Sequence, residues 1–192
     1  MQYTEVEVKY SLPDPAALAR RMTELAAPLL GEYRQIDTYF NTRGRDFLAS
    51  DIVSEWLRLR TETIPGSPAH SSINFKRWLP LGSREPSHCD EYESAVADVD
   101  AVRLLLEALG CTAMITVDKT RREWCLDDVK IALDTVNGLG DFIELEYAGD
   151  APTVPEAAEV LSETITRLGM PFGQQHRCGY PHMLMDRMDR HS

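Results

Sequence analysis

Ionisable side chains recur at alternate positions in short segments of this chain, and the N-terminal segment is the clearest case. Across residues 4–10, Glu5, Glu7 and Lys9 alternate with apolar and aromatic residues. Successive side chains of a β-strand point to opposite faces, so the two carboxylates and the ammonium share one face. That face is either solvated or binds a charged ligand.

The same alternation continues in later segments and separates acidic from basic groups. The acidic set comprises Glu5, Glu7, Glu91, Glu93, Asp134, Glu144 and Glu146. The basic set comprises Lys9, Arg58, Arg60, Lys76, Lys119 and Arg121. A sheet with one solvated side explains any single segment of this kind. Collectively, however, ionised side chains dominate the polar positions where serine, threonine and glutamine would normally be mixed in, which favours a bound ligand.

The residue types in these two sets indicate which ligand would fit. Arg58 and Arg60 can bind phosphate oxygens bidentately, and the lysines can act as point charges, so the basic set suits a polyanion. Clustered carboxylates need a divalent cation to relieve their mutual repulsion, and ligation by oxygen alone favours Mg²⁺ or Mn²⁺. Together the two sets describe a site for a polyphosphate with its metal ions.

The elements that would position these groups are roughly eight strands and three helices. Strands are predicted over residues 4–10, 35–41, 55–60, 72–78, 90–93, 115–124, 129–136 and 142–147. Helices are predicted over about 15–30, 99–109 and 154–168, with a short helix near the C-terminus. Amphipathic helices need apolar sheet surface to cover, so the charged strand faces would look at each other. The expected fold is α+β: an eight-stranded antiparallel β-barrel forming a tunnel, with a charged lumen and helices packed on the outside.

Length and composition fit one domain over residues 1–192, with a less regular C-terminal tail over about 175–192. The net charge of −11 argues against a nucleic-acid partner. No segment reaches the roughly 18 to 20 apolar residues that span a bilayer, and the N-terminus carries no apolar leader. We therefore expect a cytoplasmic protein with no membrane and no nucleic-acid partner, acting on a small molecule and able to form a homodimer.

The motif Glu5-x-Glu7-x-Lys9 resembles the signature of the CYTH superfamily, the triphosphate tunnel metalloenzymes. This motif alone would match many strands by chance, but here a Gly-Leu-Gly-x-Phe-x-Glu-x-Glu run follows at residues 138–146. Other matches in the family's order are Asp37-Thr38-Tyr39-Phe40, Arg45-Asp46-Phe47, Leu57-Arg58-Leu59-Arg60, Lys76, Glu91-x-Glu93 and Lys119-x-Arg121. The resemblance covers nearly the whole chain, and it is strongest to the class IV adenylyl cyclase-like branch.

The resemblance implies roles for individual residues as well as the barrel fold. Mg²⁺ or Mn²⁺ would be bound by Glu5, Glu7, Glu144 and Glu146, with Asp134 as a further ligand, directly or through water. The triphosphate would be bound by Lys9, Arg58, Arg60, Lys76, Lys119 and Arg121. Tyr39 would pair with Lys9 as a catalytic proton-transfer dyad, as proposed for some triphosphatases of the family. Glu91 and Glu93 would either neutralise the cations or take part in metal binding.

The C-terminal segment departs from the family pattern, which has a basic residue followed closely by Ser-Tyr. Here the corresponding run is Arg177-Cys178-Gly179-Tyr180, and the neighbouring His176 is expected to be a surface residue. The aromatic residues Trp56, Phe75 and Trp124 are expected to pack in the core and not to stack on a base.

The resemblance implies a divalent-metal-dependent enzyme that acts on triphosphates. Our first expectation is an adenylyl cyclase, which converts ATP to cyclic AMP and pyrophosphate. The alternative within the family is a triphosphatase acting on inorganic triphosphate, thiamine triphosphate or nucleoside triphosphates. A third possibility, from a different class, is a polyphosphate-binding module without catalysis.

Overall fold

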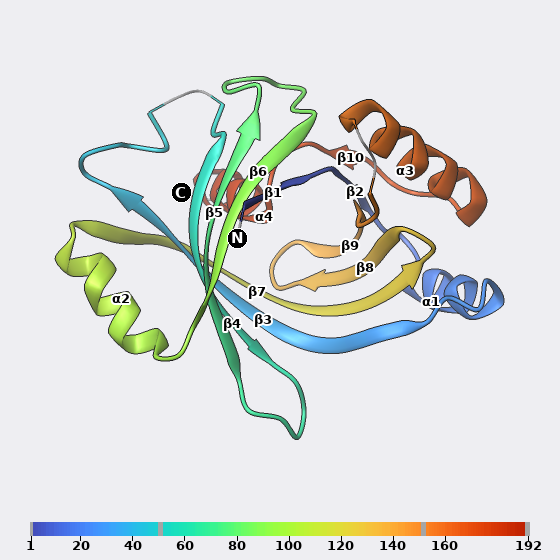
Figure 1. The fold of residues 1–192 in the computed structure, drawn as a ribbon, viewed down its shortest axis with the longest axis horizontal. Coiled ribbons are helices and arrows are strands. Elements are labelled where there is room, and N and C mark those ends of the chain that lie inside the picture. The colour runs from blue at the N-terminus through green and yellow to red at the C-terminus, as the bar shows by residue number, and fades with distance from the viewer. Residues whose placement is uncertain (1, 50–51, 151–152, 191–192) are drawn as a thin grey trace. The chain divides into compact units, whose positions relative to one another are not determined.

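The structure, a computed structural model, describes residues 2–49, 52–150 and 153–190 (Figure 1). The strands in these residues are β1 (Gln2–Glu5), β2 (Glu7–Ser11), β3 (Leu29–Thr42), β4 (Glu55–Thr63), β5 (His70–Leu79), β6 (His88–Val96), β7 (Cys111–Leu126), β8 (Val129–Val136), β9 (Gly140–Tyr147) and β10 (Gln175–His176). The helices are α1 (Pro15–Glu24), α2 (Val99–Ala108), α3 (Val154–Leu168) and α4 (Tyr180–Asp189). Residues 50 and 51, in the loop expected before the third predicted strand, lie outside the described residues.

The chain divides into two compact units, which are described separately. As far as the structure describes them, unit 1 comprises Met1–Thr4, Arg34–Asp118 and Cys178–Ser192, and unit 2 comprises Glu5–Tyr33 and Lys119–Arg177. The strands β3 and β7 contribute residues to both units.

Unit 2 is built on antiparallel strands in the order β7-β8-β9-β2-β10. One face of these strands is apolar and packs against α1 and α3. Leu18 and Met22 of α1 and Leu161 of α3 lie in one buried cluster with Ile143 and Leu145 of β9. Burying such side chains contributes about 1.5–3 kcal/mol each. The helices therefore cover the apolar face of this unit and leave the ionisable face for other contacts.

Helix α1 is shorter than predicted because its C-terminal continuation cannot stay helical. The helix begins at the N-cap Asp14, whose carboxylate accepts a hydrogen bond from the Ala17 N–H. After Glu24 the chain turns, and Ala26 has a φ of 52°, in the left-handed region. Leu29, which the predicted helix over about 15–30 included, belongs to β3 and is 49% exposed, so it does not pack with the apolar side chains of α1.

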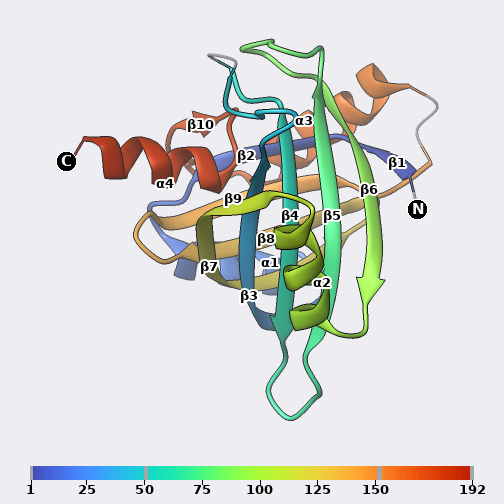
Figure 2. The same ribbon diagram turned by 90° about the vertical axis from the view of Figure 1, so that its left-hand side faces the viewer.

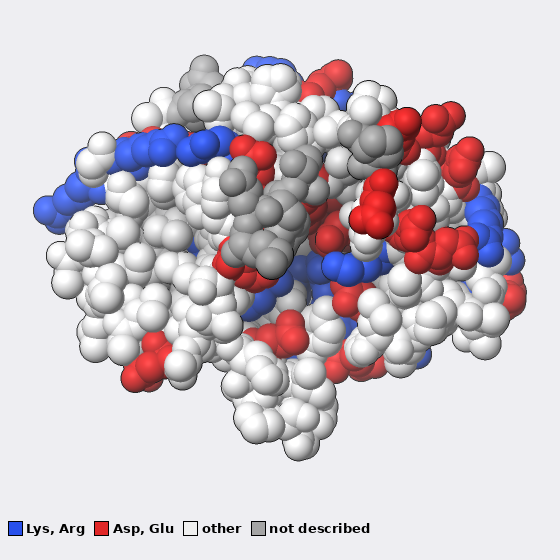
Figure 3. Space-filling model, viewed as in Figure 1, with Lys and Arg blue, Asp and Glu red and all other residues white. Residues whose placement is uncertain are grey.

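Helix α3 has the predicted bounds and shows why its signals were reliable. The Thr153 hydroxyl caps its first turn, and Gly169 ends it with a φ of 60°. Its solvent side carries exposed acidic residues, among them Glu159 and Glu163. Figure 3 shows acidic side chains gathered over this helix. The prediction for this helix is confirmed.

Unit 1 has strands in the order β1-β6-β5-β4-β3, of which β6, β5, β4 and β3 pair antiparallel, and α2 packs against β4 (Figure 2). Leu106 of α2 lies in a buried cluster with Phe40 of β3 and Leu59 of β4. The opposite side of the same strands carries Arg58 of β4, directly across from Asn74 of β5. Unit 1 thus repeats the arrangement of unit 2, with a helix on the apolar face and ionisable groups on the other.

The predicted N-terminal strand is interrupted at Val6, giving β1 and β2. The first segment is a neighbour of β6, whereas β2 pairs with β9. A break in the pairing lets two consecutive segments join different partner strands. The single strand predicted over residues 4–10 is therefore corrected to two.

The prediction of an α+β fold with antiparallel strands and helices covering their apolar faces is confirmed within each unit. Closure of eight strands into a barrel around a charged tunnel stays a prediction. A short helix near the C-terminus was also predicted and is present as α4. Among the described helices, none combines the length and the apolar character that crossing a membrane would need.

Candidate functional site

The ionisable face of unit 2 is assembled by the register of neighbouring strands. Lys9 of β2 lies directly across from Glu144 of β9, and Arg121 of β7 lies across from Asp134 of β8. Directly opposed residues of antiparallel strands project to the same side of the sheet. Residues distant in sequence therefore meet on one face.

These residues form a buried network of ion pairs. The Asp134 carboxylate accepts hydrogen bonds from Arg121 at 2.6 and 2.7 Å and from Lys119 Nζ at 2.8 Å. Arg121 also donates to Glu144 at 2.7 Å, and Lys9 Nζ lies 3.3 Å from the other Glu144 oxygen. Asp134 is 0% exposed and the other members are nearly buried. Each charge in this network consequently has an opposite charge beside it, as burial of an ion requires.

Electrostatics keep Asp134, Glu144 and Lys9 charged at neutral pH. Burial alone would raise the pKa of the Asp134 carboxyl, but Arg121 and Lys119 outweigh it and hold the pKa below its usual value. Burial would also raise the pKa of the Glu144 carboxyl, but the positive charges of Arg121 and Lys9 outweigh it and hold the pKa well below its ordinary value. For Lys9, burial opposes the charge, yet Glu144 and Glu7 raise its pKa above that of a free lysine. Lys9 is therefore a permanent cation and not a proton acceptor.

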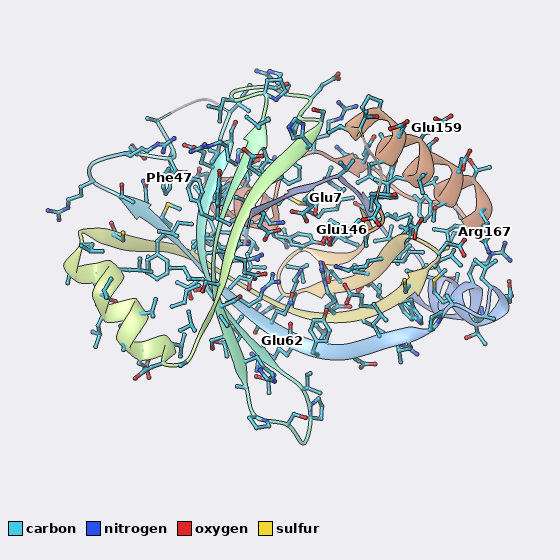
Figure 4. The ribbon with its side chains drawn as sticks, viewed as in Figure 1. Glu7, Phe47, Glu62, Glu146, Glu159 and Arg167 are labelled. Atoms are coloured by element: carbon cyan, nitrogen blue, oxygen red, sulfur yellow. The ribbon has the colours of Figure 1, made fainter. Side chains whose placement is uncertain are left out.

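A second feature of this face is a pair of like charges, Glu7 and Glu146. Glu7 of β2 lies directly across from Glu146 of β9, and Figure 4 shows the two residues close together. Lys130 Nζ lies 3.3 Å from Glu146, and Lys9 Nζ lies 3.8 Å from Glu7. Two carboxylates placed opposite each other repel. Such a pair favours binding of an additional cation.

Glu5, the remaining predicted metal ligand, is 5% exposed and ends β1. Unit 2 thus contains all five predicted metal-binding carboxylates, together with Lys9, Lys119 and Arg121.

Unit 1 contains the other three predicted triphosphate-binding residues. Arg60 donates two hydrogen bonds of 2.7 Å to the Asp37 carboxylate, which is 1% exposed. Glu91 lies 3.7 Å from Lys76 and 3.9 Å from Arg58, and it accepts a hydrogen bond from Asn74. These contacts are those expected if Glu91 neutralises the cations. Glu93 accepts a hydrogen bond of 2.9 Å from the Ser72 hydroxyl.

Arg58 differs from its neighbour Arg60 because part of its hydrogen-bonding capacity is unused. It is 8% exposed, and its contact with Asp37 is a loose 3.7 Å. Among the described residues, the buried Arg58 Nε has no hydrogen-bond acceptor. Burial opposes its charge, but Asp37 and Glu91 raise its pKa, so the guanidinium stays protonated. A buried donor without an acceptor costs about 1–3 kcal/mol, and an anionic ligand would satisfy it.

Tyr39, the other predicted catalytic residue, lies in unit 1, whereas Lys9 lies in unit 2. The Tyr39 ring packs edge-on against Trp56 at a centroid distance of 5.6 Å. Burial, and then Asp37, raise the pKa of the Tyr39 hydroxyl, so it is neutral at physiological pH. The proton-transfer dyad stays a prediction. Trp56 and Trp124 are buried as packing residues, as predicted.

A divalent metal fits some of the predicted ligands better than others. Within residues 2–49, 52–150 and 153–190, no group of three or more His, Cys, Asp or Glu residues could hold a metal ion by itself. Mg²⁺, however, is often bound by one or two carboxylates, with the other ligands supplied by water and substrate phosphates. The Glu7–Glu146 pair meets that requirement. Asp134 fits poorly because both its oxygens already accept hydrogen bonds from Arg121 and Lys119.

Three groups at these faces received no role from the sequence. Asp37 was matched to the family only as part of a motif, yet it orients Arg60. Asn74, which is 1% exposed, binds Glu91. Ser11 and His176 lie 165 residues apart and are hydrogen-bonded to each other. Strand alternation could have placed Asp37 and Asn74, whereas no local pattern links Ser11 to His176.

The fold and its two ionisable faces place this chain in a known family. The model of the CYTH domain matches residues 3–179, so the chain belongs to the CYTH domain family. Adenylate cyclase CyaB of Aeromonas hydrophila is 26% identical over 178 residues, which cover 92% of this chain and 86% of that protein.

Solved structures extend this similarity to the fold. The PH1819 protein of Pyrococcus horikoshii OT3 superimposes with a TM-score of 0.80 and 28% identity, covering 95% of this chain and 99% of that one. A Hippeastrum protein, provisionally named an adenylyl cyclase and described as having a dominant triphosphatase activity, has a TM-score of 0.68 and 17% identity. Its alignment covers 97% of this chain and 96% of that chain, and at this identity it shows the shared fold alone.

Proposed function

We propose that this protein is a divalent-metal-dependent enzyme that acts on triphosphates, and that it converts ATP to cyclic AMP and pyrophosphate. The observation that carries the proposal is Arg58, a buried and charged guanidinium whose Nε has no acceptor among the described residues. Phosphate oxygens are strong acceptors that match the fork of an arginine. An anionic substrate would therefore complete the hydrogen bonding of this side chain.

Each unit offers its own set of cations in this proposal. In unit 1, Arg58 lies a loose 3.7 Å from Asp37 and would bind phosphate oxygens directly, as would Lys76. In unit 2, Lys119 and Arg121 are held rigidly by Asp134 and supply a fixed positive field. Positioned charges of this kind account for most of the catalysis of phosphoryl transfer.

The Glu7–Glu146 pair would hold the divalent metal, with Glu5 as a further oxygen donor. When bound, Mg²⁺ or Mn²⁺ neutralises charge on the phosphate oxygens and so stabilises the transition state. Asp134 is reassigned in this proposal from metal ligand to positioning residue, because its oxygens are occupied by Lys119 and Arg121. Glu144, which pairs with Lys9 and Arg121, sets the positions of those two cations.

Cyclisation is preferred to hydrolysis because a relative aligned over 92% of this chain is named an adenylate cyclase. The alternative is a triphosphatase, the activity described for the Hippeastrum protein that shares this fold. Both reactions need the same cations to bind the phosphates. They differ in the attacking group, which is the ribose 3′-hydroxyl in cyclisation and water in hydrolysis, and in the phosphorus atom that is attacked.

A product assay distinguishes the two reactions. The purified protein is incubated with ATP and Mg²⁺ or Mn²⁺, and the products are separated by chromatography. Formation of cyclic AMP and pyrophosphate in equal amounts is the expected result. Release of orthophosphate without cyclic AMP would assign the protein as a triphosphatase, to be followed with inorganic triphosphate and thiamine triphosphate. Tight binding of inorganic triphosphate without any turnover would identify a non-catalytic module.

Replacing Arg58 by methionine tests the observation on which the proposal depends. Loss of a charge-assisted hydrogen bond costs about 1.5–3 kcal/mol, so KM for the triphosphate should rise roughly 10- to 100-fold. The matched control is Arg77→Met on β5, since Arg77 lies across from Glu55 on the opposite face of the sheet and donates to its carboxylate. An unchanged KM in Arg58→Met would remove Arg58 from the substrate site.

A further inference from the structure

The C-terminal segment 173–176 is attached to the charged face of unit 2 through β2. In β10, His176 lies directly across from Lys9 and Gln175 across from Tyr10. The Ser11 N–H donates to the Gln174 carbonyl at 2.9 Å, and the Gly173 N–H donates to the Ser11 carbonyl at 2.8 Å. This segment therefore extends the sheet of unit 2 as an edge strand next to β2.

His176 projects onto the same face as Lys9 and Ser11. Opposed residues of antiparallel strands share a side, and Lys9 and Ser11 are two positions apart on β2. The Ser11 Oγ and His176 Nε2 atoms are 2.6 Å apart, a short hydrogen bond. The imidazole also packs edge-on against Phe142, with the ring centroids 5.5 Å apart and an interplanar angle of 72°. His176 was expected at the surface, and in the structure its side chain is partly buried and makes these two specific contacts.

Gly173 shows that the approach of this segment to Ser11 is close. A Cβ at residue 173 would lie 2.9 Å from Ser11 Cβ and 3.1 Å from the Ser11 carbonyl oxygen. Only glycine fits without displacing the strand. Backbone pairing and the packing of the imidazole on Phe142 thus hold Ser11 and His176 together, and the glycine at residue 173 permits the close approach of the two strands.

We propose that Ser11 and His176 form the proton-accepting pair of the reaction. This inference rests on the proposed function and adds to it the group that receives the proton of the attacking hydroxyl. Lys9 and Tyr39, the pair expected from the family resemblance, are poor acceptors, because Lys9 is a permanent cation and Tyr39 is a neutral phenol.

The charges around His176 favour the neutral imidazole that an acceptor must have. Burial, and then Lys9 across the strand pair, lower the pKa of His176 below its usual value of 6.5. Glu144, which faces Lys9 from β9, pairs with that lysine and moderates its charge. The side chain of Arg177, the next residue on the same segment, is exposed. His176 is consequently unprotonated at pH 7 and able to take up a proton.

The proton transfer balances for either reaction. The attacking oxygen is the ribose 3′-hydroxyl in cyclisation or water in hydrolysis. Its proton moves to Ser11 Oγ while Ser11 passes its own proton to His176 Nε2. The attacking oxygen forms the new P–O bond, the bridging P–O bond breaks, and its electron pair leaves with the departing phosphate group. The imidazolium then returns the proton to solvent.

The test compares His176→Gln and Ser11→Ala with the control His70→Gln, whose side chain is exposed on β5. Removal of a general base lowers kcat by about 10²-fold or more. We expect that loss in both variants, with KM changed less than about twofold and the acidic limb of the kcat/KM–pH profile abolished. The double variant should be no slower than either single one, and imidazole should restore activity to His176→Gly.

Several results would overturn the inference. If His176→Gln keeps the wild-type kcat and acidic limb, the proton acceptor is another group, and the proposed function stands. If the wild-type protein turns over no triphosphate, both proposals fail together. A measurement independent of the variants is the ¹⁵N spectrum of His176 in the wild-type protein. Inorganic triphosphate should shift its ring signals, and unchanged signals would place the pair outside the substrate site.

Discussion

Replacing Asp134 by asparagine should lower the free energy of unfolding by about 3–5 kcal/mol, because it leaves two buried cations without their shared carboxylate. Asp134 is 0% exposed and accepts three hydrogen bonds from Arg121 and Lys119. Urea denaturation of the variant and the wild type measures the difference. The matched control is Asp118→Asn. The Asp118–Arg34 pair has similar geometry but is largely exposed, so this loss should stay below about 1 kcal/mol.

The difference in the free energy of unfolding between the wild type and Asp134→Asn should also depend on pH. The folded-state pKa of Asp134 is lowered, so the folded protein binds fewer protons here than the unfolded chain, whose aspartates titrate near about 3.9. The stabilisation is therefore complete above about pH 4 and is lost as the pH falls through the lower folded-state pKa. An equal difference at pH 7 and at the acid end of the stability range would show that Asp134 stabilises through packing and not through charge.

Removing the opposed carboxylates in the double variant Glu7→Gln, Glu146→Gln should reduce metal-dependent turnover by about 10³-fold. A bound metal contributes several kcal/mol to stabilising transition-state charge, and this is the corresponding loss in rate. The fold should be retained or slightly stabilised, because the substitution relieves repulsion between residues directly opposite each other. Activity is measured over a range of Mg²⁺ concentrations, and Mn²⁺ binding is measured by calorimetry without substrate.

The control for this variant is Glu159→Gln, which removes one exposed carboxylate of α3 that lies apart from Glu7 and Glu146 (Figure 4). It should bind Mn²⁺ and turn over substrate like the wild type. Full activity in the double variant would mean that Glu7 and Glu146 do not hold the metal. In that case Glu5 and Glu144 would be the next carboxylates to replace.

Most of the elements could be predicted because their local signals are strong. The strand Val129–Val136 and the helix Val154–Leu168 have the predicted bounds, since alternation defines the first and a terminal glycine ends the second. Helix α1 was predicted too long because the apolar period continues into Leu29 after the backbone has left the helix at Ala26. The apolar period depends only on side-chain type, so it cannot show where a residue with left-handed backbone conformation ends the helix.

The candidate site was only partly predictable for a related reason. Alternation identified Lys9, Glu144, Arg121 and Asp134 as residues of ionisable faces, and the register of the strands confirms that they share one face. Alternation does not show which charges neutralise one another. Asp134 was therefore expected to bind metal, whereas both its oxygens contact cations. Arg58 and Arg60 looked equivalent, yet only Arg60 is bidentate to Asp37.

The sequence by itself determined the charge of each face of the strands, because a period of two assigns every side chain to one side regardless of what lies opposite. It also determined the family, because the spaced carboxylates and cations occur in one chain order that the CYTH model matches over residues 3–179. Only the tertiary structure decided how those charges pair, since pairing depends on strand register. Register brought Glu7 opposite Glu146, and it brought His176, 165 residues along the chain, into hydrogen-bonding distance of Ser11.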